Sequence, residues 1–427
     1  MGAKWYREVS HGQWMALAAA LLGWMFDGFE MGIFPLVARP ALIDVLGLSD
    51  TANVDQLVGL WNGRITAAFL VGAALGGWTF GWLGDRVGRV RAMVLSVLTY
   101  ALFTGFCGLA QGPWQLAGLR FLAALGMGGE WALGVALVME IWPGHTRPVL
   151  AGMIGAAANV GFVLTGFVKM GLEASRVDVA QGGWRVVLFV SAFPALLTFF
   201  ILRFVPESEK WRHAAATTPR VGLTAIFAPA LWRRTLLGAV LSGIPLLVTW
   251  GLVQWIPLWV GKMTGDQQMV NFAQITSGCG AVLGSFCGAV LGNRFSRRWA
   301  YCGLCLSALL VSSYLFGYFG SHPIVSGDWH FLVTVTALGA CTAAFYGWIP
   351  LYLPELFPTR VRATGQGFGY NSGRMIAAVG ALSTGILMNE VFQGSYARAG
   401  TTISLIYVAG LAVIWLAPET RGQPLPE

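Results

Sequence analysis

Charged side chains are scarce in this 427-residue chain. Asp, Glu, Lys and Arg together make up 11% of it, and 56% of its residues are hydrophobic, whereas a soluble domain carries roughly 25% charged residues. This scarcity excludes an ordinary water-soluble core. The 57 glycines fit helices that approach closely in lipid through small faces, such as Gly72-xxx-Gly76 and Gly77-xxx-Gly81. The composition therefore predicts a membrane protein.

The chain also has few residues that carry enzyme or metal chemistry. Its six cysteines all fall in apolar stretches, and the Cys302-x-x-Cys305 pair has neither a nearby His nor a second pair, so we expect packing roles and no metal site. All five histidines lie in loops or near the ends, which makes His a poor candidate for a buried proton carrier.

A nucleotide-binding loop is missing as well. The Gly261-Lys262 pair has Ile256 where the first glycine of a P-loop should stand, so no loop of this kind can cradle a triphosphate. We therefore expect neither an enzyme nor a bound cofactor. The energy source that remains for active transport is an ion gradient, and we predict the proton gradient.

Three loop signatures, in contrast, each occur twice. Residues 83–89 read LGDRVGR and 291–297 read LGNRFSR; residues 140–147 read EIWPGHTR and 355–362 read ELFPTRVR. A shorter third pair reads PES from Pro206 and PET from Pro418. Parallel repeats of this size indicate a transporter built from two similar bundles.

The apolar stretches predict twelve transmembrane helices, because each span needs about 20 mainly apolar residues. In the first half we place them at 14–37, 57–82, 92–111, 115–141, 150–172 and 185–204. In the second half they lie at 235–259, 271–291, 300–319, 329–353, 365–388 and 401–417. The predicted fold is all-α, with two pseudo-symmetric six-helix bundles: residues 1–204, a polar, partly helical linker at 205–234, and residues 235–427.

Most Lys and Arg residues fall in the loops on one side of these spans, which predicts that both termini are cytoplasmic. The net charge of +8 then reflects loops that face an anionic leaflet of the lipid bilayer and requires no nucleic acid. We expect a multi-pass protein of a bacterial inner membrane that functions as a monomer.

The loop at residues 81–91, GWLGDRVGRVR, resembles the loop between helices 2 and 3 of the major facilitator superfamily. The degenerate copy at 288–298, the RFL at 120–122 and the twelve predicted spans extend this resemblance over the whole chain. Four further segments resemble the proton symporters for sialic, aromatic and monocarboxylic acids: FDGFE at 26–30, GMGGEW at 126–131, PELFPTRVRATGQGFGYNSGR at 354–374 and PETRG at 418–422. Sugar porters share the PES and PET endings and the DRxGR loop.

The resemblance implies that the repeated loops act as a gate. In the family, the Asp of the first loop lies between the halves near a helix N-terminus and Arg side chains, which attract it, and Asp85 should take this role. The second copy has Asn293 and Ser296 instead, so its latch should be weaker. The alternative is that the arginines only set the topology. The full set of gating candidates is Asp85, Arg86, Arg89, Glu140, Arg147, Arg294, Glu355 and Arg362.

Charges inside the spans are the candidates for function, because a charge at the bilayer centre costs about 2.5–3.5 kcal/mol and so usually faces a cavity or a partner. Three acids and three bases qualify, which would allow near-neutral internal pairing. They are Asp27, Glu30, Arg64, Arg120, Glu130 and Arg374.

The acids of the first half are candidates for proton coupling. Asp27 and Glu30 lie three residues apart and share a helix face, so they should raise each other's affinity for a proton; the alternative is a structural ion pair with Arg64 or Arg120. Arg120 and Glu130 lie about 80° apart around their helix and about 15 Å apart along it, so they cannot pair. Arg120 should instead reach an acid of the first helix, and Glu130 is either a second proton carrier or a structural group.

Arg374 is the main candidate for substrate binding. No acid is predicted inside the six spans of the second half, and a guanidinium without an acid partner can bind a carboxylate with two hydrogen bonds. Tyr370 and Asn371 precede it on the same helix, and the Asn371 amide could hold a hydroxyl or a carboxylate oxygen. The alternative is a bridge between the halves, from Arg374 to Asp27 or Glu30.

Weaker candidates for the cavity lining are polar or aromatic groups, which orient ligands. They are Arg64, Asn159, Gln254, Trp255 and Tyr346. Together these residues predict proton-coupled uptake of a small organic anion by alternating access. The competing predictions are a proton-coupled sugar or polyol porter, an exporter of drugs or metabolites, and, least favoured, a receptor or scaffold.

Overall fold

The computed structural model describes residues 9–48, 54–175, 182–217, 222–264, 266–386, 392 and 395–427. Within these ranges the secondary structure is helical and contains no β-strand. The predicted all-α fold with two six-helix halves is confirmed.

The first half contains six long helical segments. They are α1 (His11–Leu46), α2 (Val54–Val87), α3 (Arg89–Cys107), α4 (Pro113–Ile141), α5 (Arg147–Ala174) and the pair α6 (Trp184–Val190) and α7 (Leu197–Phe204). The short α8 (Glu209–Thr217) follows inside the predicted linker, and none of its residues is buried.

The second half repeats this pattern. It contains α9 (Trp232–Gly251) with α10 (Ile256–Thr264), α11 (Gln267–Arg294), α12 (Arg297–Phe319), α13 (Trp329–Leu356), α14 (Arg362–Ile386) and α15 (Tyr396–Ser404) with α16 (Ile406–Val413). Eleven segments of the described chain are long and apolar enough to cross a membrane, and α14 is the remaining long helix. The last span begins at Tyr396 rather than at the predicted 401, because the Ser395 side chain caps α15 by accepting from the Arg398 N–H.

Side-chain chemistry explains where several helices begin. Ser10 and Gln13 form a capping box at the start of α1, which satisfies backbone donors that a helix start leaves free. Gly88 precedes α3 with a φ of 111°, a conformation that a residue with a Cβ rarely adopts, so α2 and α3 can follow each other after a single residue.

Glycine faces set the packing within each half. A Cβ at Gly76 of α2 would meet the backbone of Leu125 in α4, and one at Gly284 of α11 would meet the backbone of Ala340 in α13. The helix pairs α2–α4 and α11–α13 therefore pack backbone to backbone at equivalent places in the two halves, as small residues permit in membranes.

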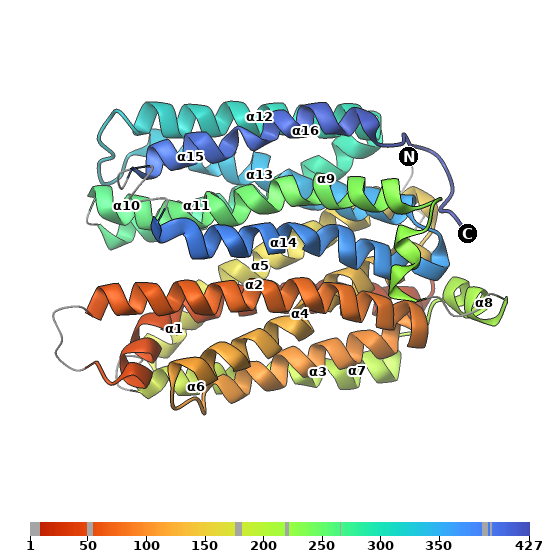
Figure 1. The fold of residues 1–427 in the computed structure, drawn as a ribbon, viewed down its shortest axis with the longest axis horizontal. Helices are drawn as coiled ribbons and strands as arrows, with labels where there is room; N and C mark the ends of the chain where they lie inside the picture. Colours follow the sequence, from red (N-terminus) through yellow and green to blue (C-terminus); the bar gives the residue numbers. More distant parts are fainter. Residues whose placement is uncertain are drawn as a thin grey trace.

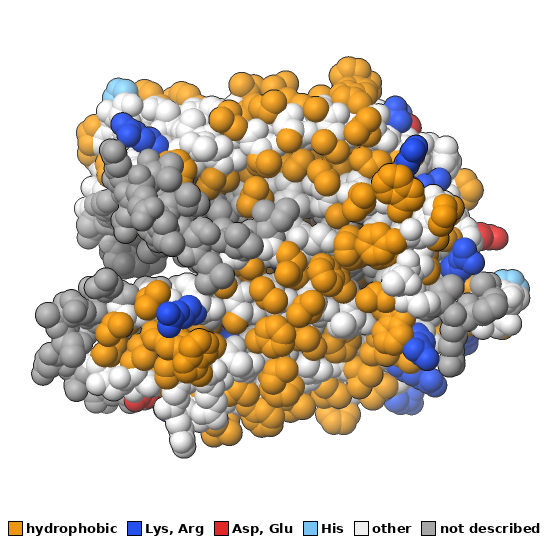
Figure 2. Space-filling view, in the orientation of Figure 1, with side chains coloured by type: hydrophobic (Ala, Val, Ile, Leu, Met, Phe, Trp, Pro, Cys, Tyr) orange, Lys and Arg blue, Asp and Glu red, His pale blue; other side chains and the backbone are white. Residues whose placement is uncertain are grey.

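The two halves meet along α2 with α14 and along α5 with α11, and Figure 1 shows α2 and α14 side by side in the middle of the molecule. Both described chain ends and α8 lie at one end of the bundle (Figure 1), which we call the α8 end; the opposite end is the far end. In Figure 2, hydrophobic side chains cover the middle of the visible face and Lys and Arg gather at the α8 end, as expected of a protein that spans a bilayer.

Candidate functional site

Away from the α8 end, five charged side chains of the described residues lie in the interior of the bundle, and each is at most 3% exposed. Asp27 and Glu30 come from α1, Arg120 and Glu130 from α4, and Arg374 from α14. A buried charge is costly without a partner, so the partner of each group indicates its role.

Glu30 and Arg120 form an ion pair. The Thr104 hydroxyl also donates to Glu30 Oε1, at 2.9 Å, and the Arg120 guanidinium lies 4.4 Å from the Phe34 ring centre and 4.6 Å from that of Phe69. The prediction that Arg120 reaches an acid of the first helix is confirmed for this contact. Because the pair is enclosed and satisfied in part by other groups, it can stay ionised in the interior.

Asp27 and Glu130 have no such partner. Neither oxygen of either carboxyl group accepts a hydrogen bond from a described residue. The charged groups that influence Asp27 are Glu130, Arg374 and Glu30. Glu130 lies so close to α1 that a Cβ at Gly23, one helical turn before Asp27, would clash with its carboxyl group. The carboxyl group of Glu130 thus lies against α1 one helical turn from Asp27.

Arg374 is held by its own helix. Its Nη1 donates to Asn371 Oδ1 at 2.6 Å, its guanidinium lies 5.4 Å from the Tyr370 ring centre, and its Nε has no partner among the described residues. The predicted bridge from Arg374 to Asp27 or Glu30 is not formed, since none of the ion pairs between described residues includes Arg374. Its charge nevertheless faces Asp27 across the interface.

Asn371 joins the two halves. Its amide nitrogen donates to Gly128 O of α4 at 3.2 Å and to Gly367 O at 3.0 Å. The predicted free amide for a substrate hydroxyl is therefore not present in this conformation, because both ends of the side chain are already bonded. The same contacts make Asn371 sensitive to any movement of α14 against α4.

Aromatic rings surround this cluster. Tyr370 stacks on Trp131 of α4 with ring centres 3.9 Å apart and an interplanar angle of 18°, and Trp24 of α1 meets Tyr370 edge-on at 6.0 Å. Tyr346 of α13 lies 6.5 Å from Tyr370, and its hydroxyl bonds to Thr249 at 2.6 Å. Rings from both halves thus meet beside Arg374.

The other predicted lining residues lie elsewhere or are bonded locally. Arg64 is not the interior charge or partner of Asp27 that was predicted: it is exposed near the far end, where it packs against Trp61 and Trp114 with ring centres 4.9 and 6.0 Å away. Its placement at the edge of the cavity stays a prediction. Gln254 is exposed, and Asn159 donates to Gly155 O of its own helix at 3.3 Å. The side chain of Trp255 lies outside the described residues.

At the α8 end, Asp85 binds the first turn of α14. It accepts from the Thr364 N–H at 2.7 Å, from the Thr364 hydroxyl at 2.5 Å and from the Ala363 N–H at 3.2 Å. Free N–H groups at a helix start attract an anion, so the predicted position of Asp85 between the halves is confirmed.

Arg89 and Glu140 extend this latch. Arg89 Nη2 donates to Glu140 at 3.0 Å and to Thr359 O at 2.9 Å, and Arg362 Nη1 donates to the same Glu140 oxygen at 3.0 Å. Thr359 and Arg362 belong to the second half, so these bonds hold the halves together at the α8 end.

The second copy of the loop makes the same bonds within its own half only. Arg297 binds Glu355 through Nε at 3.0 Å and Nη2 at 2.8 Å, and the Thr420 hydroxyl donates to Glu355 at 2.6 Å. Asn293, which replaces Asp85, is exposed. Arg147, the counterpart of Arg362, faces Glu355 but forms no ion pair with it, and its Nε has no described partner.

Two gating candidates lie outside this network. Arg86 is exposed and stacks on Trp82, with its guanidinium 5.0 Å from the ring centre, and Arg294 is exposed. Neither forms an ion pair with another described residue. Their placement as gate residues is wrong for this conformation, because both side chains point to the outside of the bundle.

The third repeated signature has a function that sequence reasoning missed. Glu207 of the PES segment accepts from the N–H groups of Arg89 and Val90 at 3.0 and 3.1 Å, and Glu419 of the PET segment accepts from those of Arg297 and Arg298 at 3.0 and 3.3 Å. Although partial burial acts to raise it, these backbone donors lower the pKa of Glu419 below its ordinary value. Each acid therefore caps the helix that carries the central arginine of its loop.

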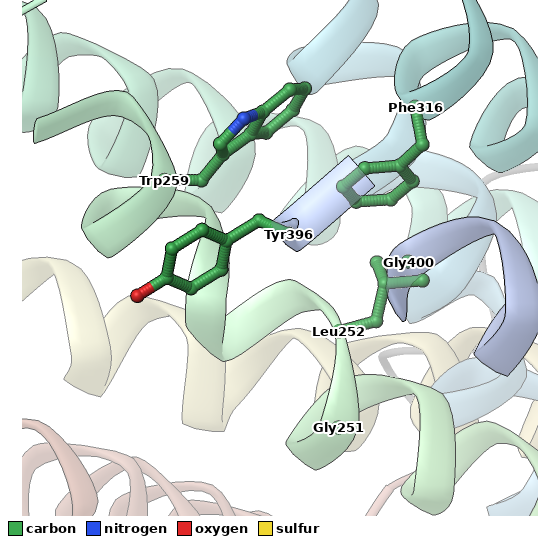
Figure 3. A pocket seen from close by; sticks show the side chains of 6 residues that line it. All are labelled: Gly251, Leu252, Trp259, Phe316, Tyr396 and Gly400. Atoms are coloured by element: carbon green, nitrogen blue, oxygen red, sulfur yellow. The ribbon is translucent and has the colours of Figure 1, made fainter. Parts of the chain in front are cut away.

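An apolar pocket lies apart from these charges, within the second half. Its lining comes from α9, α10, α12, α15 and the residue that follows α9 (Figure 3). The lining residues are Gly251, Leu252, Trp259, Phe316, Tyr396 and Gly400. None of its lining residues is charged, so it offers nothing to hold an anion. Among the described residues, no group of three His, Cys, Asp or Glu side chains could hold a metal ion.

Comparisons with known proteins cover nearly the whole chain. The family model described as "sugar (and other) transporter" matches residues 15–218 and 223–427. The chain is 32% identical over 424 residues to a probable 4-methylmuconolactone transporter of Cupriavidus pinatubonensis, covering 98% of this chain and 93% of that protein. It is 25% identical to the sialic acid transporter NanX of Escherichia coli, over 97% of this chain and 96% of that protein.

A solved structure of the major facilitator superfamily proton:xylose symporter XylE superimposes with a TM-score of 0.82, covering 97% of this chain and 98% of that one, at 16% identity. This likeness shows the fold. The family match over nearly the whole chain and the relatives show more: the protein is an integral, multi-pass membrane transporter that belongs to the sugar (and other) transporter family of the major facilitator superfamily.

Proposed function

We propose that this transporter takes up a small organic anion together with a proton, by alternating access. The observation that carries the proposal is the buried Arg374, which has no carboxylate in ion-pair distance among the described residues and faces Asp27 across the two halves. A buried guanidinium in this state can exchange one weak anionic neighbour for a better bonded one.

The exchange would couple the two substrates. In the empty carrier, the charge of Arg374 would favour an ionised Asp27. An incoming carboxylate would bind Arg374 and remove that stabilisation, so Asp27 would take up a proton, because a charge in a low-dielectric interior without a counter-charge is costly. The pair of sites formed by Asp27 and Arg374 would then be neutral in both the loaded and the empty carrier when the halves move.

Asn371 would transmit the exchange to the fold. It bonds Arg374 on one side and Gly128 O of the first half on the other. A substrate that draws Arg374 away would weaken this bond between α14 and α4, while the network of Asp85, Arg89, Glu140 and Arg362 holds the α8 end closed. We propose that the α8 end is cytoplasmic, following the Lys and Arg distribution, in a bacterial inner membrane, and that the monomer is the functional unit.

The rings beside Arg374 favour a flat anion. Trp24, Trp131 and Tyr370 bring aromatic faces and edges from both halves to the guanidinium, and such surfaces gain about 0.5–1.5 kcal/mol from a further aromatic ring beyond area burial. We therefore place aromatic and conjugated carboxylates ahead of lactate and sialate within the anion class.

Uptake into proteoliposomes loaded at neutral pH tests the proposal. We expect radiolabelled benzoate to enter faster when the outside is acidified, to exceed lactate and sialate, and to lose this acceleration with a protonophore. Passive entry of benzoic acid is subtracted with protein-free liposomes. Glucose uptake that exceeds all three acids would instead establish a sugar porter, for which a buried Arg374 is not needed, and net release from preloaded vesicles alone would establish an exporter.

A further inference from the structure

The interior of the carrier has one acid too many. With Arg64 at the far-end surface, the buried charges of the described side chains outside the network at the α8 end are the acids Asp27, Glu30 and Glu130 and the bases Arg120 and Arg374. The balanced set of three acids and three bases expected from the sequence is therefore wrong. An unpaired charge in the centre of the bilayer costs about 2.5–3.5 kcal/mol, so one carboxyl group must be neutralised in another way.

The surroundings of the acids single out Glu130. Glu30 is paired with Arg120 and accepts from Thr104. Asp27, like Glu130, accepts from no described residue, but it lies within the electrostatic reach of Arg374. Glu130 is 1% exposed, and neither of its oxygens accepts from a described residue. It also takes part in none of the ion pairs between described residues.

The groups that face Glu130 would not stabilise a negative charge on it. From α1 come Asp27, itself an acid, and Gly23, whose lack of a Cβ leaves room for the carboxyl group of Glu130. From α3 comes Tyr100, 1% exposed, whose hydroxyl has no described partner and which senses the charges of Asp27, Glu130 and Glu30. The charge of Arg374 from α14 acts on Asp27.

We propose that Glu130 is a permanent proton-binding site that keeps its proton in both the loaded and the empty carrier, while Asp27 alone exchanges a proton. The roles in the transport cycle rest on the proposed function. The protonated state of Glu130 does not depend on it. A neutral Glu130 makes the empty interior balanced, with Glu30 against Arg120 and Asp27 against Arg374. With substrate on Arg374 and a proton on Asp27, the interior is balanced again.

The charge balance fixes the stoichiometry. One proton enters with each monovalent anion, and the net movement of charge is zero, because the proton on Glu130 never leaves. If Glu130 also released its proton, two protons would enter with each anion, and uptake would carry one positive charge inward.

Infrared spectroscopy of the purified protein in lipid nanodiscs, without any substrate, tests the permanent proton. At neutral pH we expect the carbonyl band of a protonated carboxyl group, shifted when glutamate is labelled with ¹³C at the side-chain carboxyl and unchanged when aspartate is labelled. Labelling leaves the native side chains in place, so the test does not depend on the folding of a variant. Absence of the band, or a shift with labelled aspartate only, would overturn the proposal.

A pair of variants assigns the band. Glu130→Gln should remove it, whereas Glu355→Gln should leave it, because Glu355 is a buried carboxylate already bonded to Arg297 and Thr420. A band that persists in Glu130→Gln would assign the proton to another glutamate and contradict the proposal. Since no substrate is present, failure here leaves the transport function standing, and failure of benzoate uptake leaves this measurement unaffected.

Discussion

The two copies of the repeated loop differ in what their bonds connect. In the first copy, Asp85 and Arg89 bind the start of α14 and Thr359 O, and thus tie one half to the other. In the second copy, Arg297 and Glu355 bind each other and Thr420, all within one half. Asn293 lacks the charge that would attract the opposite helix start. One copy therefore works as a latch between the halves, and the other mainly stabilises its own bundle.

The interior shows the same division. The first half contributes Asp27, Glu30 and Glu130, and the second contributes Arg374 with Asn371. Duplication gave both halves the same scaffold, yet the groups that can bind a proton and those that can bind an anion now lie on opposite sides of one interface. Movement of the halves thus changes the distance between the two kinds of group, which is what coupling requires.

The largest effect is expected from removing the anion site. Arg374→Ala should lower benzoate uptake about 100-fold, because truncating one partner of a buried charged contact costs about 2–5 kcal/mol. The measurement is initial uptake in proteoliposomes. Arg64→Ala is the matched control: the same change at an exposed arginine that packs on Trp61 and Trp114 should change uptake less than about threefold. Equal losses in the two variants would remove the distinction between interior and surface arginine.

The next effect concerns the latch. Asp85→Asn should slow uptake about tenfold, since it weakens charge-assisted bonds to Thr364 and to Arg89 that are worth about 1.5–3 kcal/mol each. Equilibrium binding of benzoate, measured by calorimetry, should be retained, because Asp85 lies at the α8 end and not beside Arg374.

The converse substitution, from Asn to Asp in the second copy of the loop, tests the same comparison. Asn293→Asp should change uptake less than about twofold, because Asn293 is exposed and surface charges contribute little, about 0–1 kcal/mol. An effect of Asn293→Asp as large as that of Asp85→Asn would show that both copies latch the halves.

The smallest effect concerns the helix caps, where the two copies are alike. Glu419→Ala should lower the thermal midpoint by about 1–2 °C at pH 7, since a lost cap costs about 1 kcal/mol, and Glu207→Ala should do the same. Because the folded-state pKa of Glu419 is lowered, its stabilisation is fully present above the unfolded pKa of about 4.3 and is lost as the pH falls through the lower folded pKa. The difference between wild type and Glu419→Ala should therefore vanish in acid; a difference that grows in acid would contradict this.

Loop motifs and helix periodicity were good guides to the fold and the latch. The repeated signatures predicted the two bundles, and the position of Asp85 followed from a short, charged motif at a fixed place between two spans. The pairing of Arg120 with a first-helix acid also followed, because a buried charge has few ways to be compensated. In each case local sequence restricts the outcome strongly.

Residues whose role depends on how helices rotate and tilt could not be predicted in this way. Arg64 lies inside an apolar stretch, yet α2 turns it to the surface near the far end, where it packs against Trp61 and Trp114. The Asn371 amide donates to the carbonyl oxygen of Gly128 in the other half of the chain, a contact that the spacing of residues in the sequence does not reveal. The caps Glu207 and Glu419 were visible as a repeat, but their function required the distance to α3 and α12.

The most direct test of the division between the halves is the proton dependence of uptake in Asp27→Asn. In proteoliposomes with a neutral interior and an acidic outside, after the passive accumulation of benzoic acid in protein-free liposomes is subtracted, the wild-type protein should accumulate benzoate against its gradient. After the same subtraction, Asp27→Asn should still exchange benzoate across the membrane but should no longer accumulate it, at any pH gradient. Accumulation by Asp27→Asn that equals that of the wild type would contradict the account, because the proton would then travel without the first-half acid that faces Arg374.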